Sequence, residues 1–420
     1  MNKVAIVGGC GRLGLRLSLV LANKGHNVIS IDLDDERITE INQGALPFTE
    51  AGADIYLEQA LKKKSLVATS DNAQIKKADI VVITLGTPVD SNLNPSLEPV
   101  AGVIFDIAEY LKKDQLIVFR NSLYPGITKR IKTLIEDKTN LKVGKDIYLV
   151  FAPELENEVK NIHDLANAPQ PIGAFDEKSF EAGQRFFKTI TKGKISFVSP
   201  EEALLSKLMN NMYEYIQAAA ANEFYLIAET FGANVYKALD ASYNYRNLHD
   251  PTQIPQPNPN AAGPGKYKEG WYLLDRIPFT ELITMSFKLN ESMPSQIVKM
   301  LENYNLQKVV ILGMTNKPNS DDARASLGYK LRRALFYKDY IVCCYDPYLP
   351  EYSDSSVLID ADAVILMTPH DEFNNLEKLK KIIKNPNLVI VDLQGFWQET
   401  KEKSKNGVWQ EKVKNKSQKK

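Results

Sequence analysis

Short apolar runs alternate with helix-like segments along most of the chain. The run Lys3–Val7 is bounded by a glycine cluster and predicts a buried strand. A helical pattern follows from residue 13 to about 23, and a second strand is predicted at 28–31. Later runs predict further strands at 80–83, 116–119, 147–151 and 195–198. Strands that alternate with helices are typical of a doubly wound parallel sheet.

The pattern changes after residue 200. Residues 201–233 predict one long helix, because the stretch 216–221 is rich in alanine. Residues 243–265 are rich in Asn, Pro and Gly, which is typical of a functional loop. From residue 308 a second alternating block predicts strands at 309–312, 341–345, 363–367 and 388–391. The tail is rich in Lys, Gln, Ser and Asn and is predicted to be disordered.

These patterns predict an α/β protein with two Rossmann-like, doubly wound parallel-sheet domains joined by a long central helix. The expected divisions are a dinucleotide-binding domain at 1–199, a central helical region with a substrate loop at 200–295, a second α/β domain at 296–400 and a disordered basic tail at 401–420.

Composition narrows the class of protein. The chain has 420 residues with 52 basic and 52 acidic side chains, so its formal net charge is zero. A neutral balance argues against nucleic-acid binding, which needs a basic face. No apolar run is long enough to span a bilayer, and no signal-peptide pattern precedes the first strand. Three cysteines cannot form a disulfide framework. We therefore expect a cytoplasmic protein with reduced thiols, no membrane partner and no metal site.

A glycine-rich loop follows the first predicted strand. Gly9, Gly11 and Gly14 form G-x-G-x-x-G, which allows a tight turn, close approach of a pyrophosphate and helix–strand packing. Asp32 ends the second strand, where a carboxylate accepts hydrogen bonds from ribose hydroxyls and repels a 2′-phosphate, so NAD is favoured over NADP. The predicted cofactor-binding residues of this region are Gly9, Gly11, Arg12, Leu13, Gly14 and Asp32.

Further motifs occur in a fixed order along the chain. They are G-T-P at 86–88, N-S-L-Y-P-G at 121–126, A-P-E at 152–154, K-L-M-N-N at 207–211, A-N-E-F at 221–224, G-M-T-N-K at 313–317, D-D-A-R at 321–324 and Y-D-P at 345–347. Each is weak alone. Together they resemble the UDP-glucose/GDP-mannose dehydrogenase family, in the branch that includes UDP-N-acetyl-sugar dehydrogenases, from about residue 3 to about 395.

The resemblance implies an NAD-dependent enzyme that oxidises C6 of a UDP- or GDP-linked sugar to a carboxylate and forms a homodimer through the central helix. It implies that Thr87 and Ser122 lie beside the cofactor. The implied catalytic residues are Lys207, Asn211, Glu154, Ser122 and Glu269. The implied substrate-binding residues are Glu154, Lys207, Asn211, Arg246, Lys317 and Arg324, with Lys317 and Arg324 at the pyrophosphate.

One departure from the family pattern concerns its nucleophile. Where the family branch has A-A-G-P-C-x-x-K-D, this chain has A-A-G-P-G-K-Y-K-E at 261–269, so Gly265 replaces the cysteine and Glu269 the aspartate. The first hydride transfer, from alcohol to aldehyde, needs no covalent nucleophile. The second needs a tetrahedral carbon, which thiolate addition creates. Losing the nucleophile is expected to slow that second step by a factor on the order of 10⁴.

Three hypotheses follow from these residues. The first is a two-electron oxidoreductase that interconverts a nucleotide-sugar alcohol and its aldehyde or ketone. The second is a pseudoenzyme that binds NAD and a nucleotide sugar without turnover. The third is a 6-phosphogluconate or 3-hydroxyacid type of dehydrogenase, which shares a K-x-x-x-N helix but ends in a helical domain. The second α/β block argues against the third hypothesis.

Overall fold

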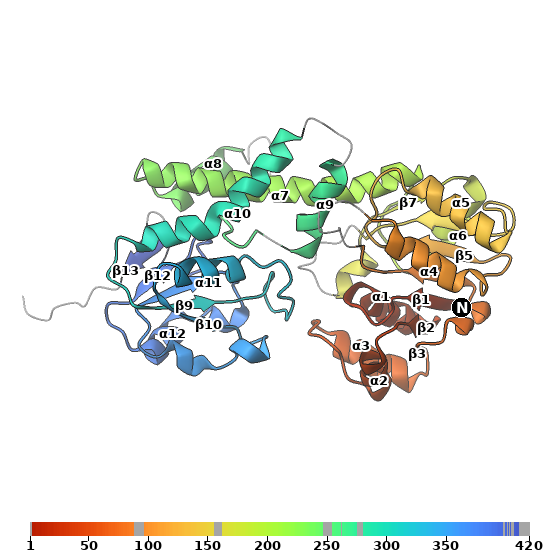
Figure 1. Ribbon diagram of the computed structural model, residues 1–420, viewed down its shortest axis with the longest axis horizontal. Helices are drawn as coiled ribbons and strands as arrows, with labels where there is room; N and C mark the ends of the chain where they lie inside the picture. Colours follow the sequence, from red (N-terminus) through yellow and green to blue (C-terminus); the bar gives the residue numbers. More distant parts are fainter. Residues whose placement is uncertain are drawn as a thin grey trace, which may run out of the picture. The chain divides into compact units, whose positions relative to one another are not determined.

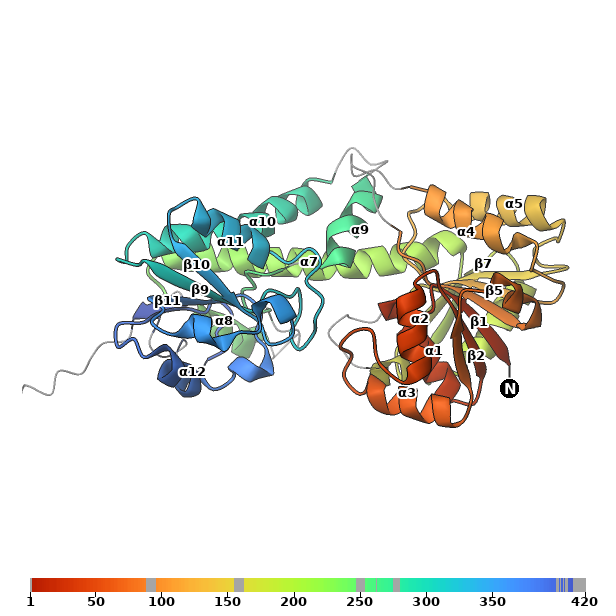
Figure 2. The same cartoon turned by 60° about the horizontal axis from the view of Figure 1, so that its bottom comes forward.

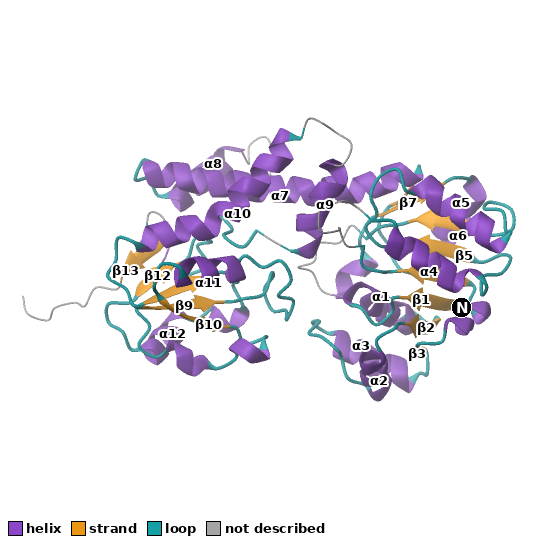
Figure 3. Cartoon of the chain, in the orientation of Figure 1, coloured by secondary structure: helices purple, strands orange, loops and turns teal. Residues whose placement is uncertain are grey.

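The computed structural model describes residues 2–87, 96–154, 162–246, 254–261, 263–274, 280–397, 400, 402, 404 and 407–410. The chain forms two compact units. We call Met1–Asn211 with Lys268–Pro278 the N-terminal unit, and Met212–Tyr267 with Phe279–Lys420 the C-terminal unit. Figure 1 shows the helices and strands of each unit, and Figure 3 distinguishes helix, strand and loop along the chain.

The N-terminal unit contains an eight-stranded sheet in the order β3-β2-β1-β4-β5-β6-β7-β8. Its strands are β1 (Lys3–Val7), β2 (Asn27–Ile31), β3 (Leu66–Thr69), β4 (Ile80–Ile83), β5 (Leu116–Phe119), β6 (Tyr148–Phe151), β7 (Gln170–Ala174) and β8 (Ile195–Val198). The first six strands pair in parallel, with β1 between β2 and β4. This order places a topological switch point at the carboxyl ends of β1 and β4, where doubly wound proteins bind dinucleotides.

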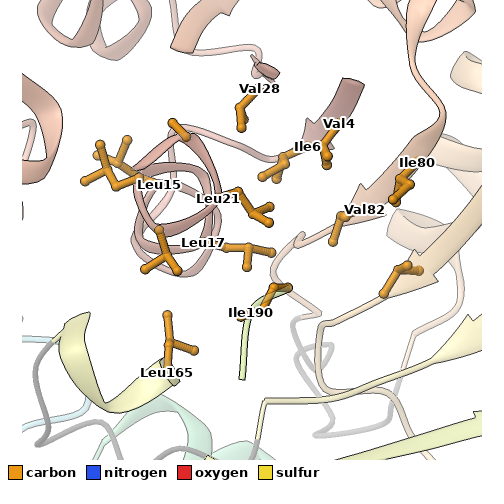
Figure 4. Packing of buried hydrophobic residues seen from close by; sticks show 14 of the residues in the cluster. Val4, Ile6, Leu15, Leu17, Leu21, Val28, Ile80, Val82, Leu165 and Ile190 are labelled. Carbon is orange, nitrogen blue, oxygen red and sulfur yellow. The ribbon is translucent and has the colours of Figure 1, made fainter. Parts of the chain in front are cut away.

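Helices cover both faces of this sheet. They are α1 (Arg12–Asn23), α2 (Asp35–Gln43), α3 (Ala53–Lys62), α4 (Glu98–Ala108), α5 (Thr128–Thr139) and α6 (Glu177–Phe187), with 3-10 turns at Asn72–Lys77 and Ile162–Ala166. Alternate residues of β1 enter different cores, because side chains of a strand point to opposite faces. Val4 and Ile6 pack with α1 and α3, whereas Ala5 and Val7 pack with α4 and α5. Figure 2 shows the two helical layers, and Figure 4 shows Leu17 and Leu21 of α1 turned toward the sheet.

The C-terminal unit contains a five-stranded sheet in the order β10-β9-β11-β12-β13. Its strands are β9 (Lys308–Leu312), β10 (Ile341–Tyr345), β11 (Ala363–Leu366), β12 (Val389–Val391) and β13 (Val408–Gln410). Its helices include α8 (Val235–Arg246), α10 (Glu281–Leu301), α11 (Gly328–Phe336) and α12 (Leu376–Ile383), with 3-10 turns at Pro350–Tyr352, Ser355–Leu358 and Asp371–Phe373. Helices α7 (Pro200–Thr230) and α9 (Pro264–Leu274) each contribute residues to both units. No helix in the described part of the chain has the length and apolar character that a membrane span requires.

The predicted α/β class is confirmed, with corrections at the sheet edges. Strands β3, β7 and β13 were not predicted, and both sheets are mixed because β7 runs antiparallel to β6 and β13 antiparallel to β12. The sequence Q-P-I-G-A of β7 contains proline and glycine, which weaken a strand signal. The prediction of a disordered tail is wrong for Val408–Gln410, because Trp409 is buried in the core of the C-terminal unit and anchors that strand.

Candidate active site

The glycine-rich loop has the geometry of a phosphate-binding turn. A side-chain carbon at Gly9 would lie 2.7 Å from the carbonyl oxygen of Ile6, and one at Gly14 would clash with the carbonyl oxygen of Gly8. Glycine is therefore required at both positions for packing. At Gly11 the nearest atom would be 3.5 Å away, so the surface of the loop there is open. An open backbone at this position allows close approach of a pyrophosphate.

The first turn of α1 supplies the electrostatic part of the same site. Gly11 is the N-cap of α1 and provides no side-chain cap, and the first turn holds no acidic residue. The backbone N–H groups of this turn therefore remain available to an anion, which the helix dipole also favours. Arg12 lies over the ring of Phe48, with 4.7 Å between its guanidinium carbon and the ring centre. This geometry fits the diphosphate of a dinucleotide.

Asp32 directly follows β2 and borders this loop. One carboxylate oxygen accepts a hydrogen bond from the backbone N–H of Cys10 at 2.9 Å, and the other accepts one from Leu33 at 2.9 Å. These bonds hold the carboxylate at the edge of the loop, where ribose hydroxyls would meet it. The Cys10 thiol is fully buried, and burial, reinforced by the charge of Asp32, raises its pKa to about 12. A protonated, enclosed thiol is a packing group rather than a nucleophile.

A buried carboxylate joins two predicted catalytic residues. Glu269 of α9 is 1% exposed. Its Oε1 accepts a hydrogen bond from the Ser122 hydroxyl at 2.5 Å, and its Oε2 accepts one from the Asn211 amide at 2.5 Å. Ser122 follows β5 and Asn211 lies on α7. Three segments that are distant in sequence thus meet at one carboxylate inside the N-terminal unit.

Thr87 lies in the segment that follows β4 and connects that segment to this cluster. Its hydroxyl donates to the backbone carbonyl of Ser122 at 2.5 Å. Its own carbonyl accepts hydrogen bonds from the Lys268 ammonium at 3.2 Å and from the Tyr272 hydroxyl. Burial raises the pKa of Tyr272 to about 12, so this hydroxyl stays protonated at neutral pH. Lys268 and Tyr272 were not among the predicted site residues, although they lie four residues apart on one face of α9.

Lys207 lies one helical turn before Asn211 on α7, and its side chain is half-buried. Residues four apart share a helix face. Within the described part of the chain, its ammonium forms no hydrogen bond or ion pair.

Glu154 lies in a buried ion-pair cluster. Its carboxylate is 3.4 Å from a guanidinium nitrogen of Arg16 and 3.8 Å from one of Arg120. Arg16 also pairs with Glu50 at 3.2 Å. Two guanidinium groups thus compensate the charge of this buried carboxylate. The predicted role of Glu154 at the reacting carbon stays a prediction, and the structure adds two arginine partners that no sequence motif indicated.

The remaining predicted residues fall in several places. Lys317 is half-buried in the loop after β9. Asp322 holds two guanidinium nitrogens of Arg324 at 2.8 and 2.7 Å. Gly265 is the second residue of α9. The side chain of Arg246 lies outside the described residues, as does the proline of the predicted G-T-P turn.

The other two cysteines, Cys343 and Cys344, belong to β10 in the C-terminal unit. Burial raises the pKa of Cys344 to about 11. Both thiols therefore lie on a strand of the second sheet, whereas the cluster around Glu269 belongs to the N-terminal unit.

Comparison with known proteins identifies the family. Residues 2–191 match the model of the UDP-glucose/GDP-mannose dehydrogenase family, NAD binding domain, and residues 310–399 match the UDP binding domain of that family. A UDP-N-acetyl-D-mannosamine dehydrogenase of Methanocaldococcus jannaschii is 30% identical over 94% of this chain and 93% of that protein. The chain belongs to the UDP-glucose/GDP-mannose dehydrogenase family.

Two further similarities agree with this assignment. A UDP-N-acetyl-D-mannosamine dehydrogenase of Methanococcus vannielii is 29% identical over 97% of this chain and 98% of that protein. The solved structure of a UDP-D-ManNAc dehydrogenase from Pyrococcus horikoshii is 28% identical, with a TM-score of 0.85 over 94% of this chain and 96% of that one.

The family assignment settles several sequence predictions. The predicted family, NAD as the cofactor and the oxidoreductase class are confirmed. The match of residues 310–399 to a UDP binding domain removes the 6-phosphogluconate or 3-hydroxyacid alternative. This member of the family has glycine at residue 265.

Proposed function

We propose that this protein catalyses NAD-dependent, two-electron interconversion of the C6 alcohol of a nucleotide sugar and its aldehyde. The observation that carries the proposal is the cluster of Ser122, Glu269 and Asn211, which is assembled although residue 265 has no side chain. The cluster is sufficient for proton removal from an alcohol. The thiol that would carry the aldehyde onward is absent from this position.

Ser122 and Glu269 provide a route for the proton. Ser122 donates its hydrogen to Glu269, so the lone pairs of its oxygen remain to accept the hydroxyl proton of the substrate. As that proton reaches Ser122, the original serine proton moves to the Glu269 carboxylate. NAD, when bound, supplies the hydride acceptor. The alcohol thus loses one proton and one hydride and becomes an aldehyde.

In this proposal, Lys207 and Asn211 stabilise charge on the substrate oxygen. The Asn211 amide has two N–H donors, of which Glu269 occupies one. Lys207 lies on the same face of α7, one turn away. A cation and an amide donor that converge on an oxygen favour the developing alkoxide. Glu154, paired with Arg16 and Arg120, acts in this proposal as a fixed charge at the end of β6.

The substrate class follows from the second domain and from the relatives. The UDP binding domain match favours a UDP-sugar over a GDP-sugar. The relatives of Methanocaldococcus jannaschii and Methanococcus vannielii are named for UDP-N-acetyl-D-mannosamine. That compound is therefore the first substrate to test. A role in polysaccharide biosynthesis agrees with this substrate class.

Stoichiometry tests the proposal directly. Purified protein is mixed with excess NAD and limiting UDP-N-acetylmannosamine, UDP-glucose or GDP-mannose, and NADH and sugar products are quantified. We expect one NADH per sugar and an aldehyde that hydroxylamine traps. Two NADH with an acid product would contradict the proposed role of Gly265. No NADH, with sugar binding retained, would indicate a pseudoenzyme.

We also propose a homodimer that forms through α7. Tyr213, Phe224 and Ile227 are exposed on this helix, and Phe231, which directly follows its last residue, is 82% exposed. Their spacing of eleven, three and four residues places them on one stripe. An apolar stripe of this length fits a second copy of the same helix. Light scattering should give twice the chain mass, and Phe224→Glu with Phe231→Glu should halve it; a monomeric wild type would contradict the dimer.

A further inference from the structure

Asn260 lies in the loop before α9, within the C-terminal unit, and is 4% exposed. Its Nδ2 donates to the backbone carbonyl of Thr315 at 2.9 Å and to the hydroxyl of Thr368 at 3.0 Å. Its Oδ1 accepts from the backbone N–H of Leu327 at 2.8 Å and from the hydroxyl of Ser326 at 3.4 Å. These four partners use the full hydrogen-bonding capacity of a primary amide.

The partners of Asn260 lie at the switch point of the smaller sheet. Strand β9 pairs with β10 on one side and with β11 on the other. Thr315 follows the carboxyl end of β9, and Thr368 follows that of β11. In open α/β sheets the crevice between two such strand ends is where ligands bind. Gly313 has φ +83°, and a side-chain carbon there would lie 2.5 Å from Cβ of Thr368, so the two segments approach as closely as backbone allows.

The same segments carry the two basic residues predicted for the diphosphate. The Thr315 hydroxyl donates to the carbonyl of Lys317 at 3.0 Å. The Asn316 amide donates to the carbonyl of Arg324 at 2.9 Å. Asn260 therefore holds the segment that leads to Lys317 through its Nδ2, and the segment that follows Arg324 through its Oδ1. Both cations are thus linked to the loop before α9.

A second set of amides fixes that loop independently. The backbone N–H of Asn258 donates to Asn222 at 2.8 Å, and Asn222 donates back to the Asn258 carbonyl at 3.0 Å. Asn222 also donates to Asn290 at 2.9 Å. The loop is thereby attached to α7 and α10 as well as to the sheet. Rigid attachment before binding lowers the entropy that a ligand must overcome.

We propose that Asn260 is the positioning residue of the nucleoside-diphosphate subsite. By joining three segments it sets the spacing between Lys317, Arg324 and the loop before α9, and this spacing determines how tightly a nucleoside diphosphate binds. The inference rests on the proposed function, because it assumes that the ligand is a nucleotide sugar. The positioning role thus belongs to an uncharged, buried side chain that no sequence motif indicated.

The test measures binding of UDP, GDP and NAD to the full-length protein by calorimetry. Asn260→Ala should weaken UDP binding by about 10-fold or more, since four hydrogen bonds and the segment spacing are lost. NAD binds the N-terminal unit, and its affinity should stay within about twofold. Thr368→Val removes one hydroxyl at nearly constant volume and should weaken UDP binding by a smaller factor in the same direction, even if Asn260→Ala fails to fold.

Asn385→Ala is the matched control. Asn385 donates to the Ala361 carbonyl at 3.0 Å and accepts from Asn387 at 2.9 Å. Because Asn385 precedes β12 and Ala361 precedes β11, these bonds lie at the amino ends of strands of the same sheet. It should lower thermal stability without changing UDP affinity. If Asn260→Ala and Thr368→Val both leave UDP affinity unchanged, or weaken it no more than Asn385→Ala does, the inference is wrong. The proposed function would still stand. A wild type that binds neither UDP nor GDP overturns the proposed function, and the inference with it.

Discussion

Gly265→Cys is expected to change the product of the reaction from an aldehyde to an acid. The installed thiolate would add to the aldehyde carbon, the hydride would leave the resulting tetrahedral carbon, and water would hydrolyse the thioester to release acid and thiol. NADH per sugar should rise from one toward two. Acid formation should increase by a factor on the order of 10² to 10⁴ over the wild type.

The position of residue 265 favours this outcome. Gly265 lies inside the first turn of α9, where helical backbone angles accept any L-residue. A helix N-terminus lowers the pKa of a thiol and so favours the nucleophilic thiolate. Acid formation should therefore rise with pH through the thiol pKa, because only the deprotonated form adds to the aldehyde.

Two control variants separate the thiol from its side effects. Gly265→Ala should stabilise α9 by about 0.5–1 kcal/mol without forming acid, since alanine favours helix over glycine. Gly265→Ser adds a polar atom of similar size that is a far weaker nucleophile. Acid formation equal in the cysteine and serine variants would contradict the covalent route. A cysteine that iodoacetamide alkylates rapidly but that forms no acid would show that another part of the acid-forming site is missing.

Much of the N-terminal unit was predictable because its signals are local. One β-α-β segment contains the strand Lys3–Val7, the three glycines and Asp32 in succession. The structure places them together. The contacts of Glu154 were not predictable in the same way. Arg16 comes from α1, 138 residues away, and only the fold brings the two charges within 3.4 Å.

In the candidate site, too, the residue types were predictable from local motifs and their contacts were not. The residue types Ser122, Asn211 and Glu269 were predicted from motifs, but their shared carboxylate was not, because hydrogen bonds spanning 147 and 58 residues leave no local pattern. Asn260 was not predicted as a site residue at all. It lies in a stretch of Asn, Pro and Gly that sequence patterns indicate only as a loop, and its four bonds give it a specific position. Uncharged residues that act through backbone partners are visible only in the fold.

Glu269→Gln should reduce kcat by a factor on the order of 10² to 10⁴, the usual contribution of a positioned general base. The variant keeps the size of the side chain but cannot take the proton that Ser122 releases. It also replaces one acceptor by a donor, whereas Ser122 and Asn211 both donate to Glu269.

Double variants distinguish a relay from two independent effects. Because Ser122 and Glu269 pass the same proton, Ser122→Ala combined with Glu269→Gln should be little slower than the slower single variant. Glu269→Asp is the matched control, since it keeps the charge but shortens the side chain by one methylene and should retain more activity than Glu269→Gln. NAD affinity, measured by fluorescence, should change little in all three. A Glu269→Gln variant within threefold of the wild type, or fully multiplicative losses in the double variant, would contradict the relay.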